Sequence, residues 1–177
     1  MGSPPIGGDV RRSPRMGLLP SVPTLGSFDT MSTDSITIRD AAATDAPRVA
    51  ALLGTLGYPT DSAAVARRLV ALHATGADHV LVAERDGKVV AVGSMRVNPV
   101  LNADKPAAYL TALVVDDSTQ GSGIGTRLLA AAESIAAARG CGRLTVSSAH
   151  HRADAHAFYL HRGYRSTGVR FAKDLTG

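Results

Sequence analysis

The chain has 177 residues, of which 45% are hydrophobic and 19% charged, and its formal net charge is +4. These proportions are typical of a single soluble domain with a buried core, and the lack of any run of 18 consecutive apolar residues argues against a membrane-spanning helix. The weak positive charge is not gathered into a Lys/Arg run with interleaved aromatic residues, which argues against nucleic acid as a partner.

Residues 1–33 differ in composition from the rest of the chain. The first 31 residues hold five of the nine prolines and show neither helical nor strand periodicity. Such a segment cannot bury enough apolar surface to offset the entropy of ordering, so we predict a disordered extension before a domain that spans residues 34–177. Arg11-Arg12 is not followed by an apolar region, and the single cysteine, Cys141, cannot form an internal disulfide. We therefore expect a cytoplasmic protein without membrane attachment.

The folded pattern begins with a strand and two helices. The alternation of Ile36 and Ile38 predicts a short strand. Two helical stripes follow, with Asp45 and Asp61 as capping residues and Gly57 as the end of the first helix. Their apolar positions are Val49, Leu52, Leu53 and Leu56 in the first helix, and Val65, Leu69 and Leu72 in the second.

Three consecutive strands are predicted after the helices. His79–Arg85 and Lys88–Val97 are joined by Asp86-Gly87, a dipeptide that supports a type I′ hairpin turn. Ala107–Val115 is the third strand, and it leads into the segment Gln120–Thr126, here called the glycine turn.

The last third of the chain is predicted to contain two helices and three strands. The helix after the glycine turn runs to Arg139, is capped by Gly140, and buries Leu128, Leu129, Ala132, Ile135 and Ala136. The remaining elements are a strand at Arg143–Ser148, a helix at Asp154–Arg162, and closing strands at Tyr164–Ser166 and Arg170–Leu175.

The glycine turn has the features of an anion site. Gly121, Gly123 and Gly125 lack the Cβ atoms that would keep a ligand off the backbone, and the first N–H groups of the next helix have no intrahelical partner. These donors and the helix dipole suit a pyrophosphate. A Walker loop is excluded because Gly-Lys-Ser/Thr does not occur in the chain. The Gly-x-Gly-x-Gly spacing, with no acid about 20 residues later, also argues against a dinucleotide site.

Two motifs together resemble the GNAT superfamily of N-acyltransferases. Its acyl-CoA signature, Gln/Arg-x-x-Gly-x-Gly/Ala, is met by Gln120, Gly123 and Gly125. The segment Ala155-His156-Ala157-Phe158-Tyr159-Leu160-His161-Arg162-Gly163-Tyr164 resembles the family's Ala-x-x-Phe-Tyr-x-x-x-Gly-Phe/Tyr motif. The resemblance covers about residues 35–175. It implies an α/β fold with a mixed, mostly antiparallel central sheet flanked by helices.

The resemblance also implies the residues of an acetyl-CoA site. The backbone of Leu113, Val114 and Val115 would line the pantetheine arm. The pyrophosphate would lie on the N–H groups of Gly121, Ser122, Gly123, Ile124, Gly125 and Thr126, with Gln120 helping to shape the turn. Tyr159 matches the family's tyrosine that protonates the leaving thiolate, and a phenol with a pKa of about 10 stays protonated at neutral pH. Without the motif, Tyr159 would be interpreted as a core residue beside Phe158.

The function implied is direct transfer of an acetyl group from acetyl-CoA to the primary amine of a small molecule. Two alternatives stay open: a domain that binds acyl-CoA without turnover, as a sensor or interaction module, and acylation of an amine on a protein or an aminoacyl-tRNA. A homodimer is compatible with the resemblance. The first two helices would border the acceptor pocket, and the acceptor is undetermined. The candidate general bases, which the sequence does not rank, are Glu84, His79, His73 and Tyr109.

The histidines near the second motif do not predict a metal site. His156 and His161 are five residues apart and point to different sides of a helix, and the nearby carboxylate supply is limited to Asp154. His150 and His151 complete the group, and no Cys pair accompanies it. We therefore expect no metal cofactor.

Arg152 departs from the family pattern. Many relatives carry Asn three residues before the motif alanine, which here is Ala155. Arginine offers five donors that could reach a phosphate or carbonyl of the cofactor. The family's contact is not transferred to Arg152, and whether it touches the cofactor stays open.

Overall fold

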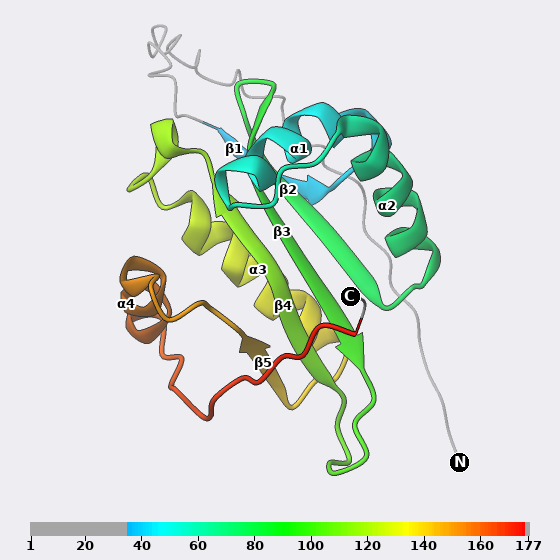
Figure 1. Cartoon of the computed structure of the whole chain (residues 1–177), viewed down its shortest axis with the longest axis vertical. Coiled ribbons are helices and arrows are strands. Elements are labelled where there is room, and N and C mark those ends of the chain that lie inside the picture. Colours follow the sequence, from blue (N-terminus) through cyan, green and yellow to red (C-terminus); the bar gives the residue numbers. More distant parts are fainter. Residues whose placement is uncertain (1–34, 176–177) are drawn as a thin grey trace, which may run out of the picture. The chain divides into compact units, whose positions relative to one another are not determined.

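A five-stranded sheet forms the centre of the computed structural model, which describes residues 35–175 (Figure 1). The strand order is β1-β2-β3-β4-β5, with antiparallel pairing from β1 to β4 and a parallel pair between β4 and β5. The strands are β1 (Ile36–Asp40), β2 (Asp78–Arg85), β3 (Lys88–Asn98), β4 (Ala107–Val115) and β5 (Arg143–Val146). This sheet confirms the predicted fold class. The predicted N-terminal extension, residues 1–33, lies outside the described residues.

Helices cover both faces of the sheet. On one face lie α1 (Ala46–Thr55) and α2 (Ser62–Ala74), and on the other lies α3 (Ile124–Ala138). Successive side chains of β2 point to opposite faces of the sheet, so both faces are apolar and need a cover. Val80 and Val82 join the core under α1 and α2, whereas Leu81 and Ala83 join the core under α3. The last helix, α4 (Ala153–His161), follows β5. Within residues 35–175, no helix has both the length and the apolar character needed to cross a membrane.

Local signals in the sequence placed most element boundaries. The Oδ1 atom of Asp61 accepts a hydrogen bond from the Ala64 N–H (2.7 Å), and α2 begins directly after this cap. Asp86 (φ 52°) and Gly87 (φ 74°) both adopt the left-handed conformation that a type I′ turn requires. The hairpin and the second helix are therefore confirmed.

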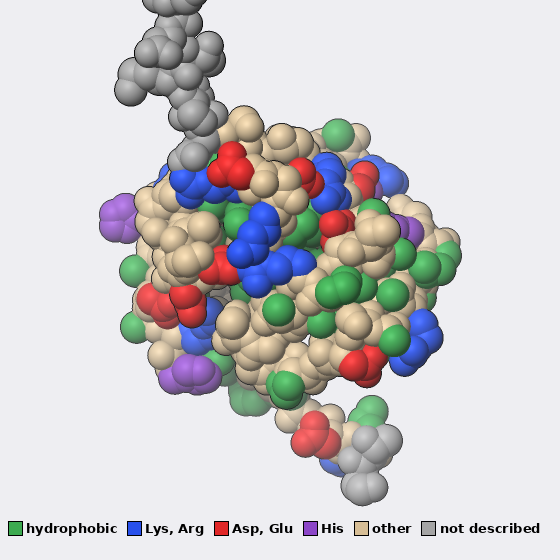
Figure 2. All heavy atoms as spheres, turned by 90° about the horizontal axis from the view of Figure 1, so that it is seen from above, with side chains coloured by type: hydrophobic (Ala, Val, Ile, Leu, Met, Phe, Trp, Pro, Cys, Tyr) green, Lys and Arg blue, Asp and Glu red, His purple; other side chains and the backbone are tan. Residues whose placement is uncertain are grey.

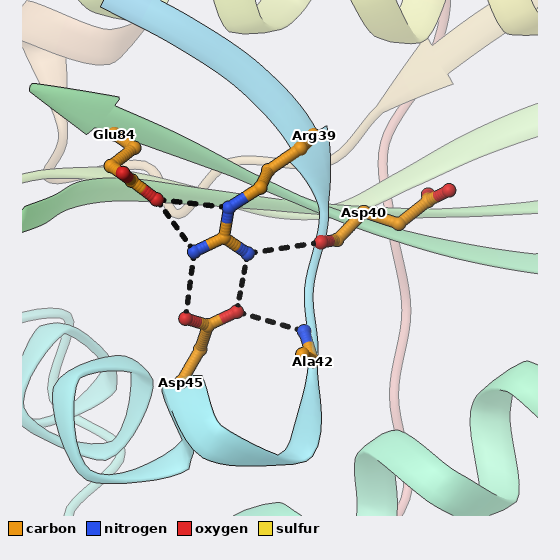
Figure 3. A network of polar contacts seen from close by, with 5 residues as sticks. All are labelled: Arg39, Asp40, Ala42, Asp45 and Glu84. Carbon is orange, nitrogen blue, oxygen red and sulfur yellow. Dashed lines mark hydrogen bonds and ion pairs between the residues drawn. The ribbon is translucent and has the colours of Figure 1, made fainter. Parts of the chain in front are cut away.

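Asp45 precedes the first helix as predicted, but the prediction that its side chain caps this helix is wrong. Asp45 lies at the start of α1, but its side chain makes no capping bond to that helix. Its carboxylate instead accepts hydrogen bonds from the Ala42 N–H (2.8 Å) and from both terminal nitrogens of Arg39 (2.7 and 2.9 Å). Arg39 also donates to Glu84 of β2 through Nε and Nη2 (2.9 and 2.8 Å), so the cluster joins β1, β2 and the start of α1 (Figure 3).

Replacement of Asp45 by asparagine should destabilise the domain by roughly 1–2 kcal/mol, because charge-assisted hydrogen bonds to a buried carboxylate are lost. Hydrogen bonds from the Arg39 guanidinium hold the pKa of Asp45 below its ordinary value. Their contribution is therefore complete above about pH 4 and is lost as the pH falls through the lowered pKa. Thermal unfolding of wild type and Asp45→Asn should accordingly converge in strong acid. A constant difference at every pH would contradict this account, and the exposed Asp104→Asn is the control.

The two predicted closing strands are wrong. Residues 164–175 form no strand, and the strand predicted at Arg143–Ser148 ends at Val146. Side chains in this last segment are largely exposed, with Val169, Phe171 and Leu175 at 68%, 91% and 89%. Their alternation has strand character, but a strand also needs a neighbour that completes its hydrogen bonds and covers its apolar side. The segment has no such neighbour within residues 35–175.

Candidate functional site

The strands β4 and β5 separate halfway along β4. β5 pairs only with Ala107–Leu110, so residues 111–115 of β4 have β3 on one side and no described strand on the other. A bulge marks the point of separation, since Ser94 of β3 opposes Ala112, Met95 opposes Leu110, and Thr111 is left between them. An unpaired strand edge presents backbone N–H and C=O groups that can bind an extended ligand.

The predicted residues Leu113, Val114 and Val115 lie along this free edge. Val114 is buried in the core under α1 and α2, and Leu113 and Val115 pack on the side of α3. Their side chains are therefore structural, while the backbone of the same strand is available for a ligand. The two interpretations of these residues are compatible.

The glycine turn places several backbone donors without acceptors at the start of α3. Gly121 (φ 80°) and Gly123 (φ 79°) adopt left-handed conformations, and Gly123 is the residue that precedes the helix. Within residues 35–175, no acceptor is found for the N–H groups of Gly121, Gly123, Ile124, Gly125 and Thr126. Free N–H groups at the positive end of a 15-residue helix are suited to binding an anion.

Side chains on both sides of the glycine turn hold its shape. The Nε2 of Gln120 donates to the Oδ1 of Asp117 (2.6 Å), and the Ser122 hydroxyl donates to the carbonyl of Thr119. Gln120 is therefore placed to shape the turn. The side-chain amide of Gln120 is thus already hydrogen-bonded within the protein, to Asp117.

An ion pair that sequence reasoning missed fixes the end of β4. Arg48 of α1 donates through Nε to the carbonyl of Val89 (2.8 Å) and forms an ion pair with Asp116, the residue after β4. Asp116 also accepts hydrogen bonds from the backbone N–H and the hydroxyl of Ser118 (2.9 and 2.6 Å). Arg48 and Asp116 are 68 positions apart, and neither lies in a motif, so no local signal could have identified the pair.

The second motif packs directly against the glycine turn. A Cβ added at Gly125 would lie 3.4 Å from Cγ2 of Val115 and 3.8 Å from Cζ of Phe158. Gly125 therefore allows the end of β4, the start of α3 and α4 to meet. The Phe158 ring lies 5.2 Å from that of Tyr159, which lies 5.6 Å from that of Tyr164, between ring centres.

Tyr159 is a partly buried phenol without a hydrogen-bond partner in the part of the chain that is described. Burial raises the pKa of Tyr159 above its ordinary value, and the positive charge of Arg152 offsets part of this rise. The hydroxyl of the neighbouring Tyr164 donates to Oε1 of Glu133 (3.0 Å). Tyr159 therefore keeps a proton that is available to a ligand, whereas the proton of Tyr164 is already engaged.

The four candidate bases are not brought together. His73 and His79 line a cavity of about 360 Å³ at the opposite end of the sheet, where the Nε2 atom of His79 is buried and has no hydrogen-bond partner among the residues that the structure describes. Glu84 is held by Arg39, and Tyr109 lies on β4 opposite Arg96 with 36% of its surface exposed. None of these contacts links a candidate base to Tyr159.

Charged side chains of both signs lie at this end of the domain, and no one kind of charge dominates it. Figure 2 views the molecule from the end at which β4 leads into the glycine turn, and basic and acidic side chains are interspersed there without a broad patch of one sign. Among residues 35–175, no group of three or more His, Cys, Asp or Glu side chains is arranged to hold a metal ion. Cys141 is partly buried against the core under α3, as a small hydrophobic residue.

Comparison with known proteins yields one family and several similar folds. Residues 49–164 match the model of the acetyltransferase (GNAT) family. An aminoalkylphosphonate N-acetyltransferase from Salmonella typhimurium is 36% identical over 97 residues, which are 55% of this chain and 63% of that protein, less than two thirds of its length.

Two solved structures illustrate the similarity of the fold. A transcriptional regulator from Bacillus halodurans C-125 has a TM-score of 0.74 at 20% identity, covering 80% of this chain and all of that one (100%). An aminoglycoside N-acetyltransferase in complex with CoA has a TM-score of 0.71 at 17% identity, covering 80% of this chain and 96% of that one. At these identities the two structures support the fold alone.

Proposed function

This chain belongs to the acetyltransferase (GNAT) family, and from that premise we propose that it transfers an acetyl group from acetyl-CoA to the primary amine of a small molecule. The proposal is supported mainly by one observation, which is that three features needed by the reaction lie close together at one end of the sheet. They are the free N–H groups of the glycine turn, the unpaired edge of β4, and the α4 helix with Tyr159.

The residues present fit the cosubstrate. The free N–H groups of Gly121, Gly123, Ile124, Gly125 and Thr126 would bind the pyrophosphate, and the glycines leave the backbone open to it. The pantetheine arm, which is extended and carries amides, would lie along residues 111–115 of β4 and complete their hydrogen bonds. Acetyl-CoA would supply the activated thioester.

The chemistry requires an acid near the sulfur and a donor near the carbonyl oxygen. When the amine attacks, negative charge develops on that oxygen, and a backbone N–H group of the free β4 edge would stabilise it. Tyr159 would donate its proton to the departing sulfur, and its raised pKa means that the phenol is protonated at neutral pH. Direct transfer needs no covalent enzyme intermediate.

We propose an aminoalkylphosphonate as the first acceptor to test, because the relative with 36% identity is named for that substrate class. α1 and α2 would border the acceptor on one face of the sheet. The acceptor amine would approach the free edge of β4 from that side.

An assay of thiol release should show CoA formed from acetyl-CoA when an aminoalkylphosphonate or a simple primary amine is present. Calorimetry should show binding of CoA in the absence of the amine. Binding of CoA without release for any amine would favour the alternative of a domain that binds acyl-CoA without turnover. If the intact protein does not bind CoA, both functions are contradicted.

A further inference from the structure

Arg48, in the first turn of α1, joins that helix to the ends of two strands. Its partly buried guanidinium donates through Nε to the carbonyl of Val89 on β3 (2.8 Å) and forms an ion pair with Asp116, directly after β4. The backbone N–H of Asp116 also donates to the carbonyl of Val90 on β3 (2.8 Å). A cation in the first turn lies at the positive end of the helix dipole, which is unfavourable, so these contacts must compensate for its position.

Asp116 connects Arg48 to the glycine turn through a continuous series of hydrogen bonds. Its carboxylate accepts from the N–H and the hydroxyl of Ser118 (2.9 and 2.6 Å), and its carbonyl accepts from the N–H and the hydroxyl of Thr119 (2.9 and 3.0 Å). The carbonyl of Thr119 in turn accepts from the N–H of Ser122 (3.4 Å) and from the Ser122 hydroxyl. Ser122 lies within the glycine turn, so the series runs from α1 to the proposed pyrophosphate site.

We propose that Arg48 is a positioning residue for the pyrophosphate of CoA, and that it acts through Asp116. The inference rests on the proposed function. A turn with three glycines has much backbone freedom to lose when it is ordered around a ligand. An anchor that orders the turn before binding reduces this loss and thereby raises the affinity. Arg48 itself exchanges no proton and touches none of the reacting atoms.

A second arginine–aspartate pair provides a matched control. Arg96 of β3 donates through Nε and Nη2 to the carboxylate of Asp78 on β2 (2.9 and 2.7 Å). Asp78 also accepts a hydrogen bond from the hydroxyl of Thr75, directly after α2 (2.8 Å), and lines the cavity at the opposite end of the sheet. Loss of either arginine should lower the stability of the fold, whereas only loss of Arg48 should weaken the binding of CoA.

The first test compares Arg48→Met with Arg96→Met. Calorimetric titration should show that Arg48→Met binds CoA at least about 10-fold more weakly than wild type, because hydrogen bonds to phosphate depend on the placement of their donors. The KM for acetyl-CoA should rise similarly with kcat unchanged, since the pyrophosphate is bound equally before and during the reaction. Arg96→Met should lower the unfolding temperature and leave the CoA affinity unchanged.

Two further measurements locate the effect. Arg48→Met/Asp116→Asn should bind CoA no more weakly than Arg48→Met, because both changes interrupt the same series of contacts. Pantetheine lacks the pyrophosphate, so its inhibition constant against acetyl-CoA should be equal in wild type and Arg48→Met. An equal loss of affinity for pantetheine and CoA would place the effect at the β4 edge and overturn the inference.

Equal affinity for CoA in wild type and Arg48→Met would also overturn the inference, as would additive losses in the double variant. A fall in kcat at unchanged KM would assign Arg48 to the reaction instead of to the pyrophosphate. If Arg48→Met does not fold, Arg48→Lys decides, since one ammonium group cannot reproduce the two contacts of the guanidinium. Its affinity should fall for CoA and not for pantetheine, and an unchanged affinity for CoA overturns the inference. Failure of wild type to bind CoA would contradict the proposed function itself.

Discussion

Replacement of Gly123 by valine is expected to weaken CoA binding at least about 100-fold, which corresponds to roughly 2.7 kcal/mol. Gly123 precedes α3 with φ 79°, a conformation that costs an L-residue about 1–2 kcal/mol and a β-branched residue more. Valine would rotate this backbone and turn the N–H groups of residues 123–126 away from a common point. Charge-assisted hydrogen bonds to phosphate contribute about 1.5–3 kcal/mol each, so the loss of one or two accounts for the effect.

The effect is expected to come from the backbone and the ligand. Apart from the two chain neighbours of Gly123, no atom of residues 35–175 lies within 4 Å of a Cβ added at this position. Calorimetric titration with CoA measures it. Gly87→Val is the matched control, since Gly87 has a similar φ (74°) and equally open surroundings but lies in the β2–β3 hairpin. If folded Gly123→Val bound CoA as tightly as wild type, the glycine turn could not be the pyrophosphate site.

Replacement of Tyr159 by phenylalanine should lower the turnover of acetyl-CoA about 10-fold or more, with little change in CoA affinity. The ring contacts with Phe158 and Tyr164 remain, and only the hydroxyl that supplies the proton is removed. The variant should therefore fold normally, since this hydroxyl makes no hydrogen bond with any of residues 35–175. Steady-state rates at saturating acetyl-CoA and amine measure the effect.

Tyr164→Phe is the matched control for Tyr159. It removes the hydrogen bond to Glu133, so it should cost about 1 kcal/mol of stability and change turnover less than Tyr159→Phe does. Equal turnover in wild type and Tyr159→Phe would leave Tyr159 with a packing role only. A larger loss of turnover in Tyr164→Phe would transfer the acid role to Tyr164.

Most of the correct predictions were based on residues that are close together in the sequence. Asp86-Gly87 predicted the hairpin because only a few residue types adopt its two left-handed conformations at low cost. β4 was predicted with the bounds found, Ala107–Val115, and the glycine turn follows it as expected. The prediction of the two closing strands was wrong because it depended on a partner far away in the sequence. The alternation around Phe171 indicates strand propensity, but it does not provide the neighbouring strand that a strand needs.

By itself, the sequence predicted most of the elements, the family, the glycine turn and the candidate residue Tyr159, because caps, turn residues and motifs act over a few neighbouring positions. Only the tertiary structure decided where β5 leaves β4, how Phe158 meets Gly125, and which arginines have carboxylate partners. The pair of Arg48 and Asp116 and the cluster of Arg39, Asp45 and Glu84 belong to this second group. They depend on side chains from distant parts of the chain, which come together only when the core is packed.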